Sequence, residues 1–292
     1  MNVRKILVGV EDTDEARSAL RFAGRLASLE AATLTVVSVH TDEYLFITTE
    51  EAEEQRNIYF REMREIADDE LSGPFSFQAS AMLSAPAGIT QVAENIDPDL
   101  IVIGSSHRGS IGRVLIGDAG SRLVTGAPCA VAVVPRGWGK DGSTEISRIG
   151  IGVNGSEESD LGIEYGSSLA LDLEASVELL GVVPHVMTPG RVGLTSPGFQ
   201  DVIREDLESR LLVDASRLPN PDVETRIRYG DAADELTEAS DHLDIIVLGS
   251  RSYGPFGRVL LGGTAVKMMR SSGCPVIVIP RPSQHEKSSH GR

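Results

Sequence analysis

Two matching stretches decide the fold of this chain: Leu100-Ile-Val-Ile-Gly-Ser105 and Ile245-Ile-Val-Leu-Gly-Ser250. Each is a continuous apolar run that ends at Gly-Ser, which is typical of a parallel strand buried on both faces of a sheet. Gly104 and Gly249 lie 145 positions apart. A repeat of this length indicates two tandem domains, because the repeating units of solenoids are much shorter.

Three further blocks recur in the same order and at nearly the same offset. In the first block, Lys5-Ile-Leu-Val-Gly-Val-Glu11 matches Arg148-Ile-Gly-Ile-Gly-Val-Asn154. In the second, Gly112-Arg-Val-Leu-Ile-Gly117 matches Gly257-Arg-Val-Leu-Leu-Gly262. In the third, Cys129-Ala-Val-Ala-Val-Val-Pro-Arg136 matches Cys274-Pro-Val-Ile-Val-Ile-Pro-Arg281. We therefore place a first domain at 1–136 and a second at 147–281. The Gly-rich stretch 137–146 suits a linker, and the polar stretch 282–292 a flexible tail.

Each copy alternates strands and helices. The strands expected in the first copy are 6–10, 33–39, 75–83, 100–103 and 130–134, and the helices are 13–29, 50–71, 86–96 and 118–125. The strands expected in the second copy are 149–153, 176–183, 223–229, 243–248 and 276–279. Thr13 or Asp12 is the expected cap of the first helix. This alternation predicts an α/β fold of two tandem doubly wound domains, each a five-stranded parallel sheet with helices on both faces.

The composition limits the kinds of molecule that the chain can bind. Of 292 residues, 41 % are apolar and 24 % charged, which is ordinary for a globular protein. Asp and Glu number 43 against 27 Lys and Arg, a net charge of −16. Such a charge repels nucleic acid and anionic lipid. With no apolar run of about 18 residues and only Cys129 and Cys274 as cysteines, we expect a cytoplasmic protein with two small buried thiols.

Glycines gather where a ligand would bind. In an open parallel sheet, ligands bind beyond the carboxyl ends of the strands, and Gly104, Gly109, Gly112 and Gly117 follow the fourth strand. Glycine lets the backbone approach a phosphate closely, and the helix that follows offers free N–H groups. The spacing of a P-loop is present, but Asp118-Ala119 and Gly263-Thr264 stand where its Lys-Ser/Thr belongs, so we exclude that motif.

With these motifs in both copies, the chain resembles a tandem member of the universal stress protein family, from about residue 5 to 136 and from 148 to 281. The resemblance implies the strand order 3-2-1-4-5 in each domain and a crevice between strands one and four. It also implies that the closing strands lie at sheet edges, where the family dimerises. In a tandem chain the two copies would pair through these strands within one molecule, and homodimerisation through other surfaces is a further expectation.

The ATP-binding branch of that family carries G-x2-G-x9-G-(S/T) after strand four. The first copy departs from it at His107 and Asp118, and the second at Ser252 and Gly263. A carboxylate at Asp118 would repel phosphate by about 1 to 4 kcal/mol at 4 Å. We therefore expect the second copy to be the binding site for ATP or AMP, with Mg²⁺ as an accompanying ion.

The residues expected around a nucleotide come from strand ends and the glycine turns. In the second copy they are Val153, Asn154, Val183, Gly249, Ser250, Arg251, Gly262, Gly263 and Thr264. In the first copy they are Val10, Glu11, Gly104, Ser105, His107, Gly117 and Asp118. Glu11 and Asn154 take the place of the ribose-binding Asp of the ATP-binding branch.

The expected function is a stress-response protein that binds or signals through a nucleotide, without dedicated catalysis and with at most weak ATP hydrolysis. Two alternatives stay open. One is an enzyme related to the PP-loop ATP pyrophosphatases, because Asn154-Gly-Ser-Glu-Glu-Ser159 occupies the place of their SGGxDS loop. The other is an interaction protein that needs no nucleotide. A receiver-like switch built on Glu11 and Asp12 is a weaker third, since no lysine follows either closing strand in the expected place.

Overall fold

The structure is a computed structural model of the whole chain. It describes residues 3–41, 50–106, 118–184, 197–250, 259 and 262–280, and of 118–119 and 197–199 it describes the backbone alone. No helix in this described part is long and apolar enough to cross a membrane.

All the described strands join one sheet of ten, in the order β3-β2-β1-β4-β5-β10-β9-β6-β7-β8. The strands of the first half are β1 (Lys5–Val10), β2 (Thr33–Thr41), β3 (Ser76–Met82), β4 (Leu100–Gly104) and β5 (Ala130–Val134). Those of the second half are β6 (Arg148–Val153), β7 (Ser176–Val183), β8 (Val223–Tyr229), β9 (Ile245–Gly249) and β10 (Val276–Ile279). Within each half all strand pairs are parallel, and the predicted order 3-2-1-4-5 is present in both.

The two halves meet at an antiparallel pair formed by β5 and β10. Val276 lies opposite Val133, and Val278 lies opposite Val131. The pairing of the closing strands within one chain, which the resemblance implies, is therefore present, and it joins the two five-stranded sheets into one. The strands at this junction are apolar and buried, as edge strands that cover each other should be.

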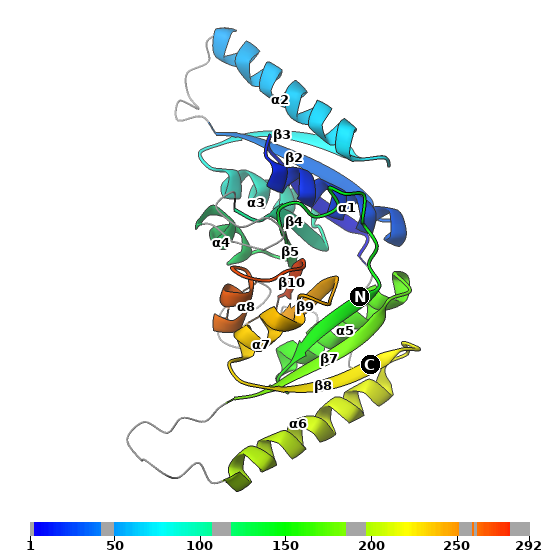
Figure 1. Cartoon of the computed structure of the whole chain (residues 1–292). Helices are drawn as coiled ribbons and strands as arrows, with labels where there is room; N and C mark the ends of the chain where they lie inside the picture. Colours follow the sequence, from blue (N-terminus) through cyan, green and yellow to red (C-terminus); the bar gives the residue numbers. More distant parts are fainter. Residues whose placement is uncertain are drawn as a thin grey trace, which may run out of the picture.

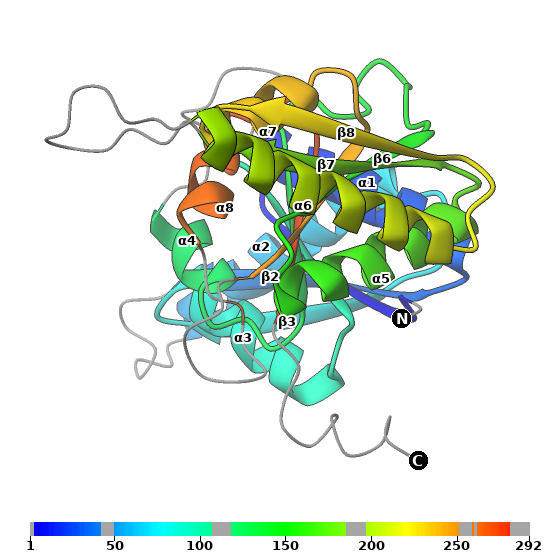
Figure 2. The ribbon, with the colours of Figure 1, turned by 90° about the horizontal axis from the view of Figure 1, so that it is seen from below.

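Helices cover both faces of the sheet, and those on one face are longer than those on the other (Figures 1 and 2). One face carries the longer helices α1 (Asp14–Glu30), α2 (Glu50–Glu70), α5 (Glu157–Asp172) and α6 (Pro197–Arg217). The other face carries the shorter helices α3 (Ala85–Ile96), α4 (Asp118–Val124), α7 (Ala232–Ala239) and α8 (Gly263–Met268). Each of the two apolar cores contains residues of both halves, so each core continues across the β5–β10 junction.

Carboxylates at equivalent positions set where the central strands begin. Asp99 Oδ2 accepts hydrogen bonds from Arg4 N and Lys5 N, at 2.8 and 2.9 Å. In the second half, Asp244 Oδ2 accepts from Ser147 N and Arg148 N, at 2.8 and 2.9 Å. Because Asp244 serves the neighbouring strand in this way, β9 begins one residue after it and not at 243 as predicted.

The first helix begins where one of the two predicted caps places it. The Thr13 side chain accepts a hydrogen bond from Ala16 N at 3.2 Å, and Thr13 has the extended backbone of an N-cap. The cap directs α1 back over β1 and β4, so that its first turn meets the carboxyl ends of these strands. Ser156 does the same for α5 by accepting from Ser159 N at 3.2 Å.

Candidate functional site

A cleft opens at the carboxyl ends of the central strands in each half, as predicted. The first cleft has a volume of about 410 Å³ and is lined by Gly9, Val10, Glu11, Thr13, Glu15, Ala16, Val37, Val39, His40, Thr41, Tyr59, Ala85, Pro86, Ile89, Ile103, Gly104, Ser105, Gly120 and Leu123. The second has a volume of about 250 Å³ and is lined by Gly152, Val153, Asn154, Ser156, Glu158, Ser159, Leu180, Val182, Ala232, Leu236, Leu248, Gly249, Ser250, Gly262, Thr264 and Ala265. Small-molecule pockets range from about 300 to 1,000 Å³, so the first cleft lies within this range and the second just below it.

The glycine that ends each fourth strand is required by a helix and not directly by a ligand. A Cβ on Gly104 would lie 2.4 Å from the carbonyl oxygen of Glu15, and a Cβ on Gly249 would lie 2.3 Å from that of Glu158. Only glycine lets the first turn of α1 or α5 approach the strand end so closely. The two contacts are equivalent, and they form the floor of the two clefts.

Next to each glycine lies a buried serine whose hydroxyl has no described partner. Ser105 is 5 % exposed and Ser250 is 6 % exposed. Their backbone N–H groups bond to Val134 O and Ile279 O, at 2.8 and 2.9 Å. Among the described residues neither Oγ atom has a hydrogen-bond partner. Both serines line a cleft, and a buried polar group without a partner costs about 1 to 3 kcal/mol.

The two clefts share a buried carboxylate, Glu15 in the first and Glu158 in the second, and they differ in charge at the position of Glu11. In the first cleft Glu11 is exposed and Glu15 is buried, with Arg136 Nε at 3.7 Å from Glu15 Oε1. In the second cleft the position of Glu11 is taken by the neutral Asn154, whose Oδ1 accepts a hydrogen bond from Ser156 N at 3.0 Å. This bond holds the carboxamide over the start of α5 and leaves its NH₂ group as a donor.

Among the described residues, the start of α8 presents backbone and a hydroxyl to the second cleft. Gly262 is the N-cap of α8, with no side-chain cap bond, and Thr264 lines the cleft two residues later. A Cβ on Gly263 would meet no atom within 4 Å. A ligand group at this point would therefore meet backbone and a hydroxyl, where the first half has Asp118 at the start of α4.

Two aromatic side chains that were not among the predicted site residues, His40 and Tyr59, form one wall of the first cleft. His40, near the end of β2, packs edge-to-face on Tyr59 of α2, with ring centroids 5.1 Å apart and planes at 74°. Both residues line the cleft. Burial raises the pKa of the Tyr59 hydroxyl, so it stays protonated. The end of the second strand was the signal that could have pointed to His40, since the strand ends of the sheet converge on the cleft.

The structure brings most of the predicted residues together. The predicted residues that line a cleft are Val10, Glu11, Gly104 and Ser105 in the first half and Val153, Asn154, Gly249, Ser250, Gly262 and Thr264 in the second. Gly263 begins α8 beside the second cleft, and Asp118 begins α4, with only its backbone described. His107, Gly117 and Arg251 lie outside the described residues.

Val183, which was expected at the nucleotide, is fully buried and is not among the residues that line the second cleft. Its neighbour Val182 lines the cleft instead. Successive side chains of a strand point to opposite faces of the sheet, so a shift of one residue decides which valine faces the cleft.

The cysteines lie away from both clefts. Cys274 is buried, and Cys129 is half-buried with its Sγ 3.5 Å from Ala130 O. Burial raises the pKa of the Cys129 thiol to about 12, which keeps it in its unreactive protonated form. Within the described ranges, no three or more His, Cys, Asp or Glu side chains gather in a way that could hold a metal ion.

The chain is similar in sequence to proteins of a known family. A family model described as "Universal stress protein family" matches residues 2–135 and 145–280. A universal stress protein of Mycolicibacterium smegmatis is 26 % identical over 285 residues, which cover 94 % of this chain and 96 % of the relative. One of Mycobacterium tuberculosis is 27 % identical over 296 residues, covering 94 % and 99 %.

Solved structures agree on the fold. A putative universal stress protein of Pseudomonas aeruginosa superposes with a TM-score of 0.66 at 17 % identity, covering 99 % of this chain and 98 % of its own. A universal stress protein of Archaeoglobus fulgidus gives 0.62 at 16 % identity, covering 96 % and 100 %. At these identities the likeness concerns the fold alone. Both comparisons extend over the two halves, so the tandem arrangement is shared.

Proposed function

This chain belongs to the universal stress protein family, and from that premise we propose that it binds an adenine nucleotide, ATP or AMP, in a strand-end cleft and acts as a stress-response binding or signalling protein. The observation that carries the proposal is the pair of buried serines, Ser105 and Ser250, which line the clefts and whose hydroxyls have no partner among the described residues. Such a hydroxyl suits the ribose or phosphate oxygens of a nucleotide, which accept and donate hydrogen bonds.

We place the preferred site in the second cleft. Asn154 offers an uncharged donor where the first cleft has Glu11, and the Gly262–Gly263 turn is open where the first half has Asp118. Its volume of about 250 Å³ suits one base and ribose, with the phosphates at the mouth. The larger first cleft, with its aromatic wall, is the competing location.

Mg²⁺ would be bound mainly through the phosphates of ATP and not by a dedicated set of protein ligands. Since the described residues hold no cluster of three or more His, Cys, Asp or Glu ligands, the phosphate oxygens and water would have to supply most of its ligands, as is common for this ion. The chain's own contribution is then to hold the base and ribose.

The segment that suggested a PP-loop enzyme has a structural role in the described part of the chain. Ser156 caps α5, and Glu157 and Glu158 lie in its first turn. Carboxylates there stabilise the helix and would repel pyrophosphate. The structure therefore gives this alternative no support, and we propose no dedicated catalysis.

Three finer expectations accompany the proposal. They are the domain limits at 136 and 147, a cytoplasmic location argued from the cysteine content, and association of two chains through surfaces other than the closing strands, which already cover each other.

The test exchanges the residues that distinguish the two clefts. In the Gly263→Asp variant, a carboxylate enters open space at the start of a helix, so folding should be unaffected while phosphate binding weakens about tenfold or more. The matched control is Asp118→Gly, which removes the carboxylate from the first half. Calorimetric titration with ATP and AMP gives the affinities, and mass spectrometry of protein purified without added ligand reveals any retained nucleotide.

The outcomes separate the two parts of the proposal. Weaker binding by Gly263→Asp, with unchanged or tighter binding by Asp118→Gly, supports the second cleft. Full-strength binding by Gly263→Asp contradicts the choice of cleft. No binding of either nucleotide by the unaltered protein contradicts the nucleotide function itself.

A further inference from the structure

The first cleft contains a compartment that the second cleft lacks. Its volume is about 410 Å³, against about 250 Å³ for the second. Its lining includes His40 and Thr41 at the end of β2 and Tyr59 of α2. Among the described residues that line the second cleft, none comes from α6, the helix that takes the place of α2 in the second half. The first cleft therefore extends toward α2, and the second has no equivalent extension.

The second half fills this position with aliphatic side chains. The registers of β1 with β2 and of β6 with β7 make Ser38 equivalent to Gly181, and His40 equivalent to Val183. Leu207 of α6 packs so closely on β7 that a Cβ on Gly181 would lie 2.8 Å from its side chain. Val183 is fully buried. The first half thus has an imidazole at the cleft where the second half has a buried aliphatic group.

Three aromatic rings support the wall of this compartment. The ring centroids of His40 and Tyr59 lie 5.1 Å apart, and Phe60 contacts both rings, at 5.6 Å from Tyr59 and 6.3 Å from His40. The Tyr59 hydroxyl also donates to Val39 O at 3.5 Å, which connects α2 to β2. These contacts hold the two cleft-lining rings in place before a ligand arrives, so that binding costs little side-chain freedom.

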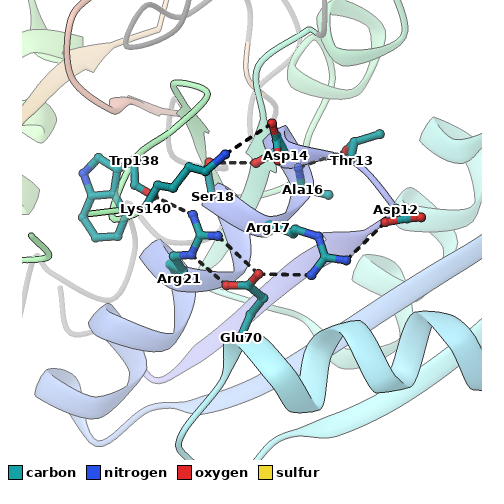
Figure 3. A network of polar contacts seen from close by, with 10 residues as sticks. All are labelled: Asp12, Thr13, Asp14, Ala16, Arg17, Ser18, Arg21, Glu70, Trp138 and Lys140. Atoms are coloured by element: carbon teal, nitrogen blue, oxygen red, sulfur yellow. Dashed lines mark hydrogen bonds and ion pairs between the residues drawn. The ribbon is translucent and has the colours of Figure 1, made fainter. Parts of the chain in front are cut away.

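The far end of α2 is anchored by charge. Glu70 Oε2 accepts a hydrogen bond from Arg21 Nε at 2.7 Å, and Glu70 Oε1 accepts one from Arg17 Nη1 at 3.2 Å (Figure 3). Both arginines belong to α1, whose first turn lies at the cleft. The position of α2, and of Tyr59 with it, is therefore fixed relative to the ends of the strands.

Glu11 gives the first cleft a negative charge that no described salt bridge balances. The neighbouring carboxylates are paired, since Asp12 lies 3.2 Å from Arg17 and Asp14 lies 3.8 Å from Lys140 (Figure 3). Glu11 is exposed and lines the cleft. None of the described residues that line this cleft is a lysine or an arginine. Glu11 will therefore attract a cationic ligand and repel an anionic one.

The charge of Glu11 acts on the aromatic wall itself. Burial is the largest cause that raises the pKa of Tyr59, and the negative charge of Glu11 adds to it. An aromatic ring attracts a cation because its face carries partial negative charge, and proteins recognise organic ammonium ions with such rings. Glu11 and the rings of His40 and Tyr59 thus combine the two kinds of attraction by which an organic cation is bound.

We propose that the first cleft binds an organic cation, an amine with an aromatic or other apolar body, whose charged nitrogen lies near Glu11 and whose body packs against His40 and Tyr59. The volume of the cleft lies within the range of small-molecule pockets. The second cleft has Asn154 and Val183 at the equivalent positions and does not share this preference. The site goes beyond the nucleotide function and does not depend on it.

Three small probes with the same ring and different charges test this preference. Benzylamine is a cation at neutral pH, benzyl alcohol is uncharged and benzoate is an anion. Titration of the isotope-labelled full chain, followed by nuclear magnetic resonance shifts, gives their affinities. Benzylamine should bind at least about threefold more tightly than benzyl alcohol, and benzoate should bind least tightly. The difference should decrease at high salt, which screens exposed charges.

Glu11→Gln tests the charged partner. This variant should remove the preference for benzylamine over benzyl alcohol, a loss of about two- to fivefold, as expected for an exposed ion pair. Glu65→Gln, which removes the same charge from an exposed position of α2, is the matched control and should leave the preference unchanged.

Tyr59→Leu tests the aromatic partner. It introduces the kind of side chain that α6 packs on β7, and it should weaken the binding of benzylamine about fivefold or more. Tyr59→Phe keeps the ring and should bind benzylamine within about twofold of the unaltered protein. Thermal unfolding of both variants shows whether the fold is retained.

Several results would overturn the proposal. They are equal affinities for the three probes, tightest binding of benzoate, and no binding of benzylamine up to about 10 mM. An unchanged preference in Glu11→Gln also overturns it, because the probe would then lie elsewhere. The nucleotide function is tested separately, with ATP and AMP in Gly263→Asp, so either proposal can fail without the other.

Discussion

Gly104 and Gly249 show how one missing side chain shapes both clefts. The glycines after the fourth strand were expected to let a ligand approach, but the space where a Cβ would lie is occupied by the backbone of α1 or α5. The glycine acts on the ligand site indirectly, since it lets the helix reach the strand end and form the floor of the cleft. The sequence predicted the importance of glycine at these two positions. It did not predict which backbone packs against each glycine, because that backbone lies about 90 residues away in the chain.

Gly104→Ala should therefore destabilise the protein strongly. The added Cβ would meet backbone at 2.4 Å, which no side-chain rotation relieves, so we expect a loss of at least about 1 to 3 kcal/mol in the free energy of unfolding. Gly73→Ala is the matched control, since a Cβ there meets nothing within 4 Å. Urea denaturation measures both variants. Equal stability of the two would show that α1 does not press on β4 as the structure has it.

At the scale of elements, the carboxyl-terminal ends of α1 and α5 bring two acids of different halves together. Burial, with the nearby Asp172 carboxylate as the second cause, raises the pKa of Glu30 from 4.5 to about 7. Glu30 Oε1 is buried and accepts no hydrogen bond from a described donor. The protonated form is thus favoured in the folded state, and the contact between the two helices depends on pH.

The sign of this dependence follows from the raised pKa. The contribution of Glu30 to stability is fully present below about pH 4.5 and is lost as the pH rises through about 7. Glu30→Gln, which is neutral at every pH, should lose less stability than the unaltered protein between these values. Glu65→Gln, on the exposed face of α2, is the control and should leave the profile unchanged. Thermal unfolding at a series of pH values provides the measurement, and parallel profiles for the Glu30 variant and the unaltered protein would contradict the assignment.

At the scale of the whole molecule, the antiparallel pair of β5 and β10 makes one folded unit of two copies. The sheet and both apolar cores continue across the junction, so the covalent connection is not what holds the halves together. Buried apolar area of this kind is the dominant favourable term in association.

Cleavage of the connection should therefore leave the halves joined. A protease site inserted between the exposed Asp141 and Gly142 allows a single cut, and the two fragments should elute together in gel filtration under native conditions. Ile277→Asp in the same chain places a carboxylate in the buried junction, which costs several kcal/mol, and should release the fragments. Separation of the fragments without that substitution would contradict the single-unit description.

The sequence by itself determined the two copies, the order of their strands and helices, and the place of the clefts at the strand ends. Apolar runs, helical spacing and the 145-residue offset are local or repeated patterns, and they need no knowledge of distant contacts. The resemblance then added the strand order and the pairing of β5 with β10.

Only the tertiary structure decided which residues meet. The carboxylate of Asp99 holds the start of β1 from 95 positions away, and Arg25 holds Thr144 across 119 positions. The choice of Val182 over Val183 for the cleft depends on the pleat of β7, and the wall formed by His40 and Tyr59 depends on how α2 crosses β2. Contacts of this kind are set by three-dimensional packing, in which sequence separation carries no information about distance.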